Sequence, residues 1–246
     1  MAASGKAMSF RNSVTFIASP RPRVGKTLLA RLLVDFYVHE GRAVAGFDLN
    51  SGEGTLAQFL PEHAAVADIA DIQGQMALFD RLVADDGTNK VVDLGHEAFE
   101  AFFKLAKQIG FSEEARRRGI AVAILFIVTP DNTSIEAYRS LRRRLPEATL
   151  TPVHNEMLGP AQYRDKYLTV GSGAGQIKLP ALAPGLRRTI DKPPFSFVDT
   201  QLANAKDIPL DTHIELQRWL RKIYLEFREL DLRVLLADLQ SSIKSS

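Results

Sequence analysis

Short apolar runs alternate with helical patterns along the first part of the chain. The runs that predict strands are residues 14–18, 43–47, 90–92 and 121–128. Between them, apolar side chains recur every three or four residues over 28–37, 97–110 and 134–144, which is the spacing of one helix face. Strands that are apolar throughout are typical of a parallel sheet covered on both sides. The pattern therefore predicts an α/β fold, in which a mostly parallel, twisted sheet carries helices on both faces.

The rest of the chain carries weaker patterns. Residues 150–154 and 176–179 are further strand candidates, and a helix is expected after Gly54. From Thr212 to about Ile243, apolar residues recur at helical spacing and predict one long helix, with a candidate break near Asp231.

Nothing along the 246 residues divides the chain convincingly, since neither an internal repeat nor a linker is found. Hydrophobic residues make up 46% and charged residues 24% of the chain, which is ordinary for a globular protein with a sizeable core. We expect residues 1–12 to be a flexible lead-in. Residues 13–246 are then expected to form a single domain, which includes a C-terminal helical region over 211–243.

Composition excludes several classes of protein. The absence of cysteine rules out disulfides, thiolate zinc sites and cysteine nucleophiles. The longest apolar run, residues 120–128, is too short to span a bilayer, and the N-terminus lacks the apolar segment of a secretory signal. These features predict a cytoplasmic protein. The net charge of +2 demands no oppositely charged partner.

Three candidate functional positions follow predicted strands. They are the Gly25-Lys26-Thr27 turn, Asp48 and Asp93. In a parallel α/β sheet, ligands bind beyond the carboxyl ends of the strands. A strand, a Gly-Lys-Thr turn and a helix form a P-loop, in which backbone amides and the lysine hold phosphate while the threonine hydroxyl binds Mg²⁺. The tripeptide also suits a plain helix start with an exposed lysine, but the two downstream acids favour the P-loop.

The loop departs from the P-loop consensus. Pro20 stands where the first glycine belongs, and Pro22 follows. Proline has no N–H, so two potential phosphate donors are missing. Arg21 and Arg23 are able to compensate, because guanidinium groups suit phosphate geometry, or else they face solvent. We favour a phosphate or partner role for at least one of them.

Residues 21–27 read RPRVGKT and are similar to K-G-G-V-G-K-T, the deviant Walker A motif of the ParA/MinD family of partitioning and positioning ATPases. Residues 47–56 resemble that family's D-L-D-P-Q-G-N-x-S/T segment, and residues 90–95 fall where its Walker B strand is expected. Residues 127–134 resemble its V-x-x-P-x-x-x-S strand end, and residues 153–155 match its V-x-N element.

Leu179-Pro180 and Lys192-Pro193 complete the resemblance, since they are similar to the family's I-P…G-K-P region. The resemblance runs from about Val14 to Val198, and the order and spacing of the motifs are its specific part.

The resemblance implies a protein that binds Mg²⁺ and ATP and forms a homodimer with the nucleotides sandwiched between two copies. It implies that Lys26 and Thr27 meet phosphate and magnesium, and that Asp48 and Asp93 hold magnesium-bound waters. Arg21 stands where the family's first lysine reaches the partner's phosphates, and Asn155 stands where its asparagine recognises the base. The implied residues are catalytic Arg21, Lys26, Asp48 and Asn50, nucleotide-binding Arg23, Val24, Gly25, Lys26, Thr27, Leu28 and Asn155, and magnesium-binding Thr27, Asp48 and Asp93.

Asn50 stands where the family has a second acid that positions the attacking water. A neutral amide orients water but cannot act as a base. Phosphoryl transfer depends mostly on positioning and electrostatics, so Asn50 is expected to slow hydrolysis rather than abolish it. Three interpretations stay open, in this order: a slow switch, a protein that binds nucleotide without turnover, and one that has lost nucleotide.

Two features suggest partners. The basic clusters at 116–118, in a connection between elements, and at 142–144 suit non-specific DNA phosphates, although solvated surfaces are the favoured interpretation. Arg187, Arg188, Arg218, Arg221 and Lys222 lie nearer the region where the family binds DNA. The C-terminal helical pattern resembles a membrane-binding helix, but its many acids favour docking on the sheet or on a partner.

The sequence thus predicts an ATP-driven dimerisation switch that positions or partitions a cargo, such as DNA or a protein machine, with slow hydrolysis. The first alternative is a non-hydrolysing pseudo-ATPase that acts as a binding or scaffold module. A ligase similar to dethiobiotin synthetase is a further alternative, because Val24-Gly25-Lys26-Thr27 also resembles its loop. Against the ligase, no second substrate motif is found.

Overall fold

The computed structural model describes most of the chain. The described residues are 12–50, 55–159, 167, 175–199 and 208–244, with the side chains of the last helix included as far as Leu236. The predicted flexible start and the middle of the 47–56 motif lie outside them, and the single-domain assignment stays a prediction. Among the described helices, none is both long and apolar enough to cross a membrane.

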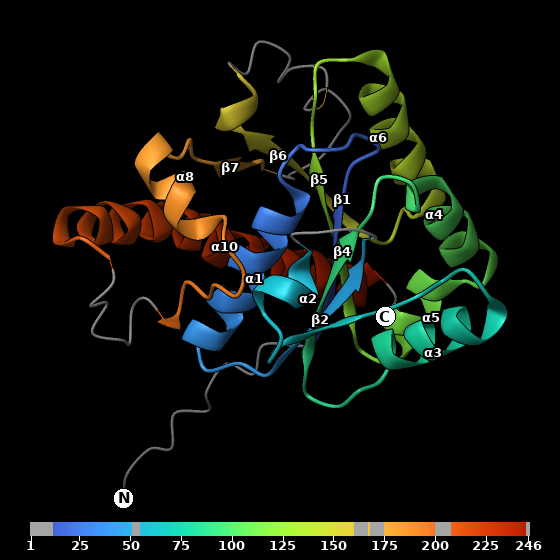
Figure 1. Cartoon of the computed structure of the whole chain (residues 1–246). Coiled ribbons are helices and arrows are strands. Elements are labelled where there is room, and N and C mark those ends of the chain that lie inside the picture. Colours follow the sequence, from blue (N-terminus) through green and yellow to red (C-terminus); the bar gives the residue numbers. More distant parts are fainter. Residues whose placement is uncertain (1–11, 51–54, 160–166, 168–174, 200–207, 245–246) are drawn as a thin grey trace, which may run out of the picture.

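A seven-stranded sheet forms the centre of the molecule (Figure 1). Its strands, in spatial order, are β3 (Ala64–Val66), β2 (Val44–Leu49), β4 (Asn89–Leu94), β1 (Ser13–Ala18), β5 (Ala121–Ile127), β6 (Thr149–Asn155) and β7 (Ile177–Leu179). All six pairings between these neighbours are parallel. The predicted α/β class is confirmed.

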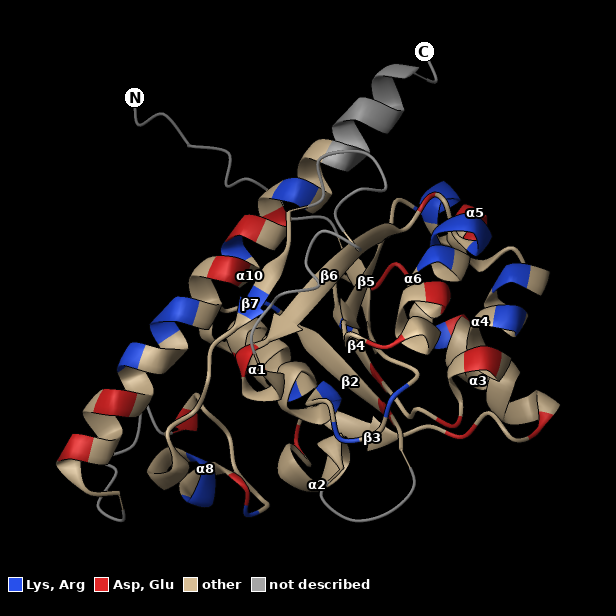
Figure 2. Cartoon of the chain, turned by 90° about the horizontal axis from the view of Figure 1, so that it is seen from above, with Lys and Arg blue, Asp and Glu red and all other residues tan. Residues whose placement is uncertain are grey.

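Helices cover both faces of the sheet (Figure 2). On one face lie α1 (Lys26–His39), α2 (Leu56–Phe59), α8 (Pro184–Ile190) and α10 (Leu210–Lys244). On the other lie α3 (Ile72–Leu82), α4 (Phe99–Gln108), α5 (Phe111–Arg117) and α6 (Asn132–Arg144). A 3-10 turn, η1 (Glu156–Leu158), follows β6.

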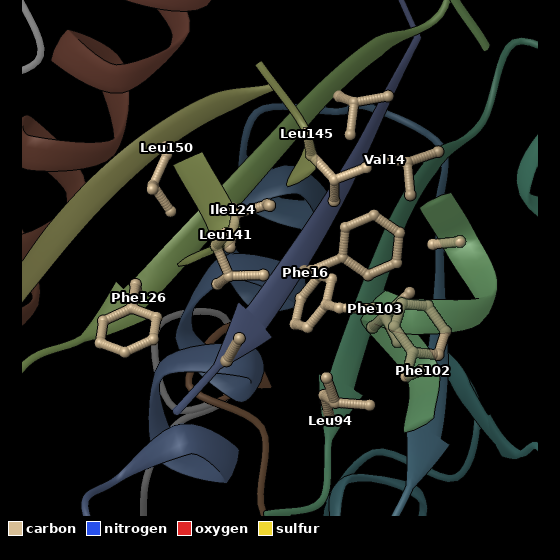
Figure 3. Close-up of a cluster of buried hydrophobic side chains, with 14 of the residues drawn as sticks. Val14, Phe16, Leu94, Phe102, Phe103, Ile124, Phe126, Leu141, Leu145 and Leu150 are labelled. Atoms are coloured by element: carbon tan, nitrogen blue, oxygen red, sulfur yellow. The ribbon is translucent and has the colours of Figure 1, made fainter. Parts of the chain in front are cut away.

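Each central strand is buried on both sides, which explains its uninterrupted apolar run. In β1, Phe16 points to the α4 and α5 side, while its neighbour Ile17 belongs to the core under α1. The Phe16 ring lies 5.2 Å from Phe102 and 6.1 Å from Phe103, measured between ring centroids (Figure 3). Burial of such rings is a main source of the stability of a core of this kind.

The structure differs from the sequence expectation at three places. The helix expected over 97–110 is α4, and a further helix that was not expected, α5, follows it after Gly110, which adopts a left-handed φ of 64°. Arg116 and Arg117 lie inside α5 rather than in a connection. Helix α10 continues through Asp231 without a break, and there Arg42 donates to the Asp231 carboxylate at 2.6 Å.

Candidate functional site

The loop between β1 and α1 closes tightly over the start of the helix. Gly25 caps α1 with φ 97° and Arg23 has φ 57°, so two residues of this short turn are left-handed. A Cβ placed on Gly25 would lie 2.8 Å from Asn155 Nδ2. Glycine is therefore required at position 25 by its backbone conformation and by its neighbour.

Lys26, the first residue of α1, is enclosed by this loop. Its side chain is buried, and Nζ donates to the backbone carbonyl of Arg21 at 2.9 Å. Burial lowers the pKa of Lys26, and the charge of Asp93 opposes that shift. The loop thus surrounds the Lys26 ammonium group at the N-terminus of α1. A positive charge beside the backbone N–H groups of a helix start is an arrangement suited to binding an anion.

Two acids from neighbouring strands lie beside Thr27. Asp48 of β2 and Asp93 of β4 are direct partners in the parallel register. Thr27 Oγ1 donates to Asp93 Oδ2 at 2.6 Å, and both carboxylates are fully buried. Asp48 also accepts from the backbone of Ala57 at 2.8 Å, which ties the start of α2 to the site.

One oxygen of the Asp48–Asp93 pair lacks a hydrogen-bond partner within the described part of the chain. Asp93 Oδ1 is buried and has no hydrogen-bond partner among the described residues. The pKa of Asp93 is raised to about 7, mainly by burial; the neighbouring charge of Asp48 also raises it, and the hydrogen bond from Thr27 opposes the rise. A buried carboxylate oxygen without a hydrogen-bond partner, next to a hydroxyl and a second carboxylate, suits a hard divalent cation such as Mg²⁺.

The residues present therefore fit magnesium, with Thr27, Asp48 and Asp93 as the groups that would hold it or its waters. Within the described part of the chain, no three His, Asp or Glu side chains gather into a metal site. Water and phosphate would have to supply the other ligands, as is usual for protein-bound Mg²⁺.

Comparison with solved structures agrees with this architecture. The chain is similar to the MinD cell division protein of Aquifex aeolicus, with a TM-score of 0.50 and 16% identity over 85% of this chain and 96% of that one. The chain has a MinD-like α/β fold. No protein-family model and no curated protein sequence matches it.

Two further solved structures resemble the chain less closely. One is the MinC:MinD cell division protein complex of Aquifex aeolicus, with a TM-score of 0.42 and 19% identity over 85% of this chain and 95% of that one. The other is a nucleotide-binding protein in complex with ADP from Archaeoglobus fulgidus, with a TM-score of 0.42 and 14% identity over 88% of this chain and 91% of that one.

Asn50 sits between the two acids of this MinD-like fold. Its backbone N–H and its Nδ2 donate to Asp48 Oδ1 at 3.0 and 3.1 Å, and Nδ2 also lies 3.2 Å from the Asp93 carbonyl oxygen. An aspartate at this position would keep the backbone N–H contact but lack the Nδ2 donor of the other two. The amide therefore holds the acid pair together in a way that a carboxylate does not.

Asn155 lies under the P-loop of the MinD-like fold. Its Nδ2 donates to the Val24 carbonyl at 2.8 Å, and its Oδ1 accepts from the Met157 N–H at 3.0 Å. The side chain is buried, so its bond to Val24 holds the loop from the protein interior. Contact with a base stays a prediction, as do the nucleotide contacts of exposed Arg23 and half-buried Leu28.

Arg21 is engaged within its own chain. Its Nε donates to Asp131 Oδ1 at 3.0 Å, and its Nη2 contacts the same oxygen. Asp131 caps α6 by accepting from Ser134 N–H at 3.1 Å, and Thr129 Oγ1 donates to it at 2.6 Å. These donors lower the pKa of Asp131 to about 2. A contact of Arg21 with a second copy would compete with this ion pair or use the guanidinium donors that the pair leaves available.

Sequence reasoning gave Asp131 no role at the site. An Asp immediately before a helical pattern is a helix N-cap signal, so this part of its role could have been read from the sequence. Tyr167, whose hydroxyl donates to the Thr129 carbonyl at 2.6 Å and lies 3.0 Å from Ser134 Oγ, had no signal at all. Tyr167 is 38 residues from Thr129 and 33 residues from Ser134 in sequence, so no local pattern connects them.

Proposed function

We propose that the protein is a nucleotide-dependent switch of the ParA/MinD kind. In this proposal it binds Mg²⁺ and ATP, forms a homodimer, and recruits a protein partner or another cargo that it positions or partitions. The observation that carries the proposal is the open carboxylate oxygen of buried Asp93, beside Thr27 and at the mouth of the loop that encloses Lys26. Packing of the core does not require a buried carboxylate, hydroxyl and ammonium group at one place. A bound magnesium ion and phosphate would use all three.

Each site residue has a defined task in this proposal. Lys26 exchanges the Arg21 carbonyl for phosphate oxygens, and the backbone from Arg23 to Leu28 surrounds the same phosphates. Thr27, Asp48 and Asp93 hold the cation, which when bound neutralises phosphate charge. Further contacts are assigned to Asn155, with the base, and to Arg21, with the phosphates of the second copy.

Hydrolysis is proposed to be slow, because Asn50 replaces the acid expected to position the attacking water. Asn50 Nδ2 donates to Asp48 and to the Asp93 carbonyl, so a water would be oriented by Oδ1, a neutral amide acceptor that takes up a proton far less readily than a carboxylate. The same observation favours a second candidate, a non-hydrolysing module that binds nucleotide and serves as a scaffold.

The deciding experiment is calorimetry of ATP and ADP binding with Mg²⁺, with phosphate release followed on the same sample. Lys26→Ala is expected to weaken ATP binding at least about tenfold, since a buried charge-assisted phosphate contact is lost. Lys104→Ala is the matched control, because Lys104 is exposed on α4. Equal ATP affinity for both variants would show that the P-loop assignment is wrong.

Two measurements separate the switch from the scaffold. If Asn50 limits turnover, Asn50→Asp raises the rate of phosphate release while ATP affinity stays similar. An ATP-dependent increase in dimer fraction by light scattering supports the switch. Binding of ATP with no release in either protein, with duplex DNA absent or present, supports the scaffold. DNA and a cytoplasmic location remain proposals on the same footing, and membrane binding is not part of the proposal.

A further inference from the structure

Helix α10 has one face fixed to the body of the protein. Its apolar side chains pack beside α1 in the core of that side of the sheet, and Trp219 Nε1 donates to the Pro180 carbonyl at 3.0 Å. The pair formed by Arg42 and Asp231 ties the helix down farther along. The buried residues of this face are Leu216, Trp219, Leu220, Ile223, Tyr224, Phe227 and Leu230.

The opposite face carries large apolar side chains that nothing in the described chain covers. Of the ten large hydrophobic residues exposed in the described part, five lie on α10, so apolar exposure is concentrated on this helix. Ile214, Leu225 and Leu232 are 47%, 62% and 51% exposed. Together with three arginines they follow each other at steps of four and three residues, which places them on one side of a helix. We call this set the outer seam: Ile214, Arg218, Arg221, Leu225, Arg228 and Leu232.

The middle of the outer seam is cationic. Arg218 and Arg221 are exposed and form no ion pair with any described residue, and Lys222 lies next to them. Arg228, by contrast, donates to Glu40 at 2.7 Å. Of the acids on the same helix, Glu229 pairs with Arg233 and Glu226 accepts from the Lys178 N–H. Glu215 is exposed three residues before Arg218, at the spacing of helix neighbours, but forms no ion pair within the described chain. Figure 2 shows this helix along one side of the molecule, with basic and acidic bands on it.

We propose that the outer seam of α10 docks an amphipathic helix of a partner protein, whose Asp or Glu side chains face Arg218 and Arg221 and whose apolar side chains cover Leu225 and Leu232. From Ile214 to Leu232 the seam is about 27 Å long at 1.5 Å per residue, which matches a helix of about five turns. In helix-on-helix contacts apolar anchors bury area, while charged positions select the partner and its orientation.

Charge decides against the other occupants. A second α10 from another copy would bring the arginines of one seam close to those of the other, and this like-charge repulsion disfavours that occupant. Nucleic-acid phosphates would satisfy the arginines but leave Leu225 and Leu232 uncovered. This inference goes beyond the proposed nucleotide switch and does not depend on it, since none of the seam residues belongs to the P-loop site.

The test uses two labelled helical peptides of about 24 residues that differ only at the positions opposite the arginines, where one has Glu and the other Lys. Fluorescence anisotropy with the full chain is expected to show at least about tenfold tighter binding of the Glu peptide, falling as salt is raised. Leu225→Ser is expected to weaken the Glu peptide by about tenfold as well.

The decisive variant is the double charge reversal Arg218→Glu with Arg221→Glu. It is expected to reverse the preference, so that the Lys peptide now binds more tightly, an outcome that a misfolded variant cannot produce. Arg139→Glu is the matched control, because Arg139 is exposed on α6, and it leaves the preference unchanged. Equal binding of the two peptides, or no binding of either, overturns the proposal. So does a preference that survives the double reversal, or a seam that binds duplex DNA or anionic vesicles but not the Glu peptide.

Discussion

Replacing Asp93 with asparagine is expected to stabilise the nucleotide-free protein, and to do so increasingly as the pH rises. Asp93 is fully buried with one open oxygen, and burial raises its pKa from 3.8 to about 7. A carboxyl whose pKa is raised on folding binds its proton more tightly in the folded state. Between the two pKa values, the folded state therefore loses stability as the proton is removed.

The size of the effect follows from the two pKa values. One pKa unit corresponds to about 1.4 kcal/mol, so the ionised carboxylate lowers the free energy of unfolding by about 4 kcal/mol above pH 7. At pH 5, where the carboxyl is still mostly protonated in the folded state, the free energy of unfolding has fallen by only about 1.6 kcal/mol of this total. The advantage of Asp93→Asn over the unsubstituted protein should thus grow by about 2 to 3 kcal/mol from pH 5 to pH 8.5.

Urea unfolding of both proteins at pH 5 and pH 8.5 measures this difference directly. Asp35 also has its pKa raised to about 7 by burial, but it is present in both proteins and cancels in the comparison. Equal advantages of the asparagine variant at the two pH values would refute the assignment of a strained carboxylate at Asp93. Added Mg²⁺ and ATP should stabilise the unsubstituted protein and not the variant, if this carboxylate is the cation ligand.

Two other substitutions test how the site and the helix behind it are held. Gly25→Ala is expected to cost about 1–3 kcal/mol in thermal unfolding, because the residue has φ 97° and its Cβ would lie 2.8 Å from Asn155 Nδ2. Gly87→Ala is its control, with φ 76° but open space, and should cost less. Trp219→Phe should cost about 1 kcal/mol in urea unfolding, since the Pro180 carbonyl loses its donor; no loss would mean that water replaces that bond.

The strands that the sequence predicted most clearly are the central ones, whose burial on both faces produces an unbroken apolar run. β3 escaped prediction because it is a three-residue edge strand, Ala64–Val66, and is largely exposed, whereas β7, equally short and at the other edge, keeps buried Ile177 and Leu179 and was a candidate. α3 escaped because its buried side chains, Leu78, Phe79 and Leu82, all lie in its second half, while Ile72 and Met76 face solvent. A short or one-sided element leaves too few periodic positions to be recognised.

The components of the candidate site were predicted better than their contacts. That the Gly-Lys-Thr turn and the two acids share one edge follows from parallel strands alone. That Asp48 lies directly opposite Asp93 depends on register, which is set by packing of the whole sheet. The pairing of Arg21 with Asp131 joins residues 110 positions apart, and no local pattern in the sequence encodes it.

The place of β4 determines when the site can first exist. β4 lies between β1 and β2, with which it pairs in parallel on either side, although it follows both in sequence. During synthesis, the P-loop turn and Asp48 leave the ribosome before the strand that joins them, and Thr27 meets no acceptor until Asp93 arrives. A nascent chain that ends before β4 therefore has the loop between β1 and α1 but lacks one of the two acids proposed to hold the cation. Ligand binding by synthesis intermediates should begin only once residues beyond Leu94 have emerged.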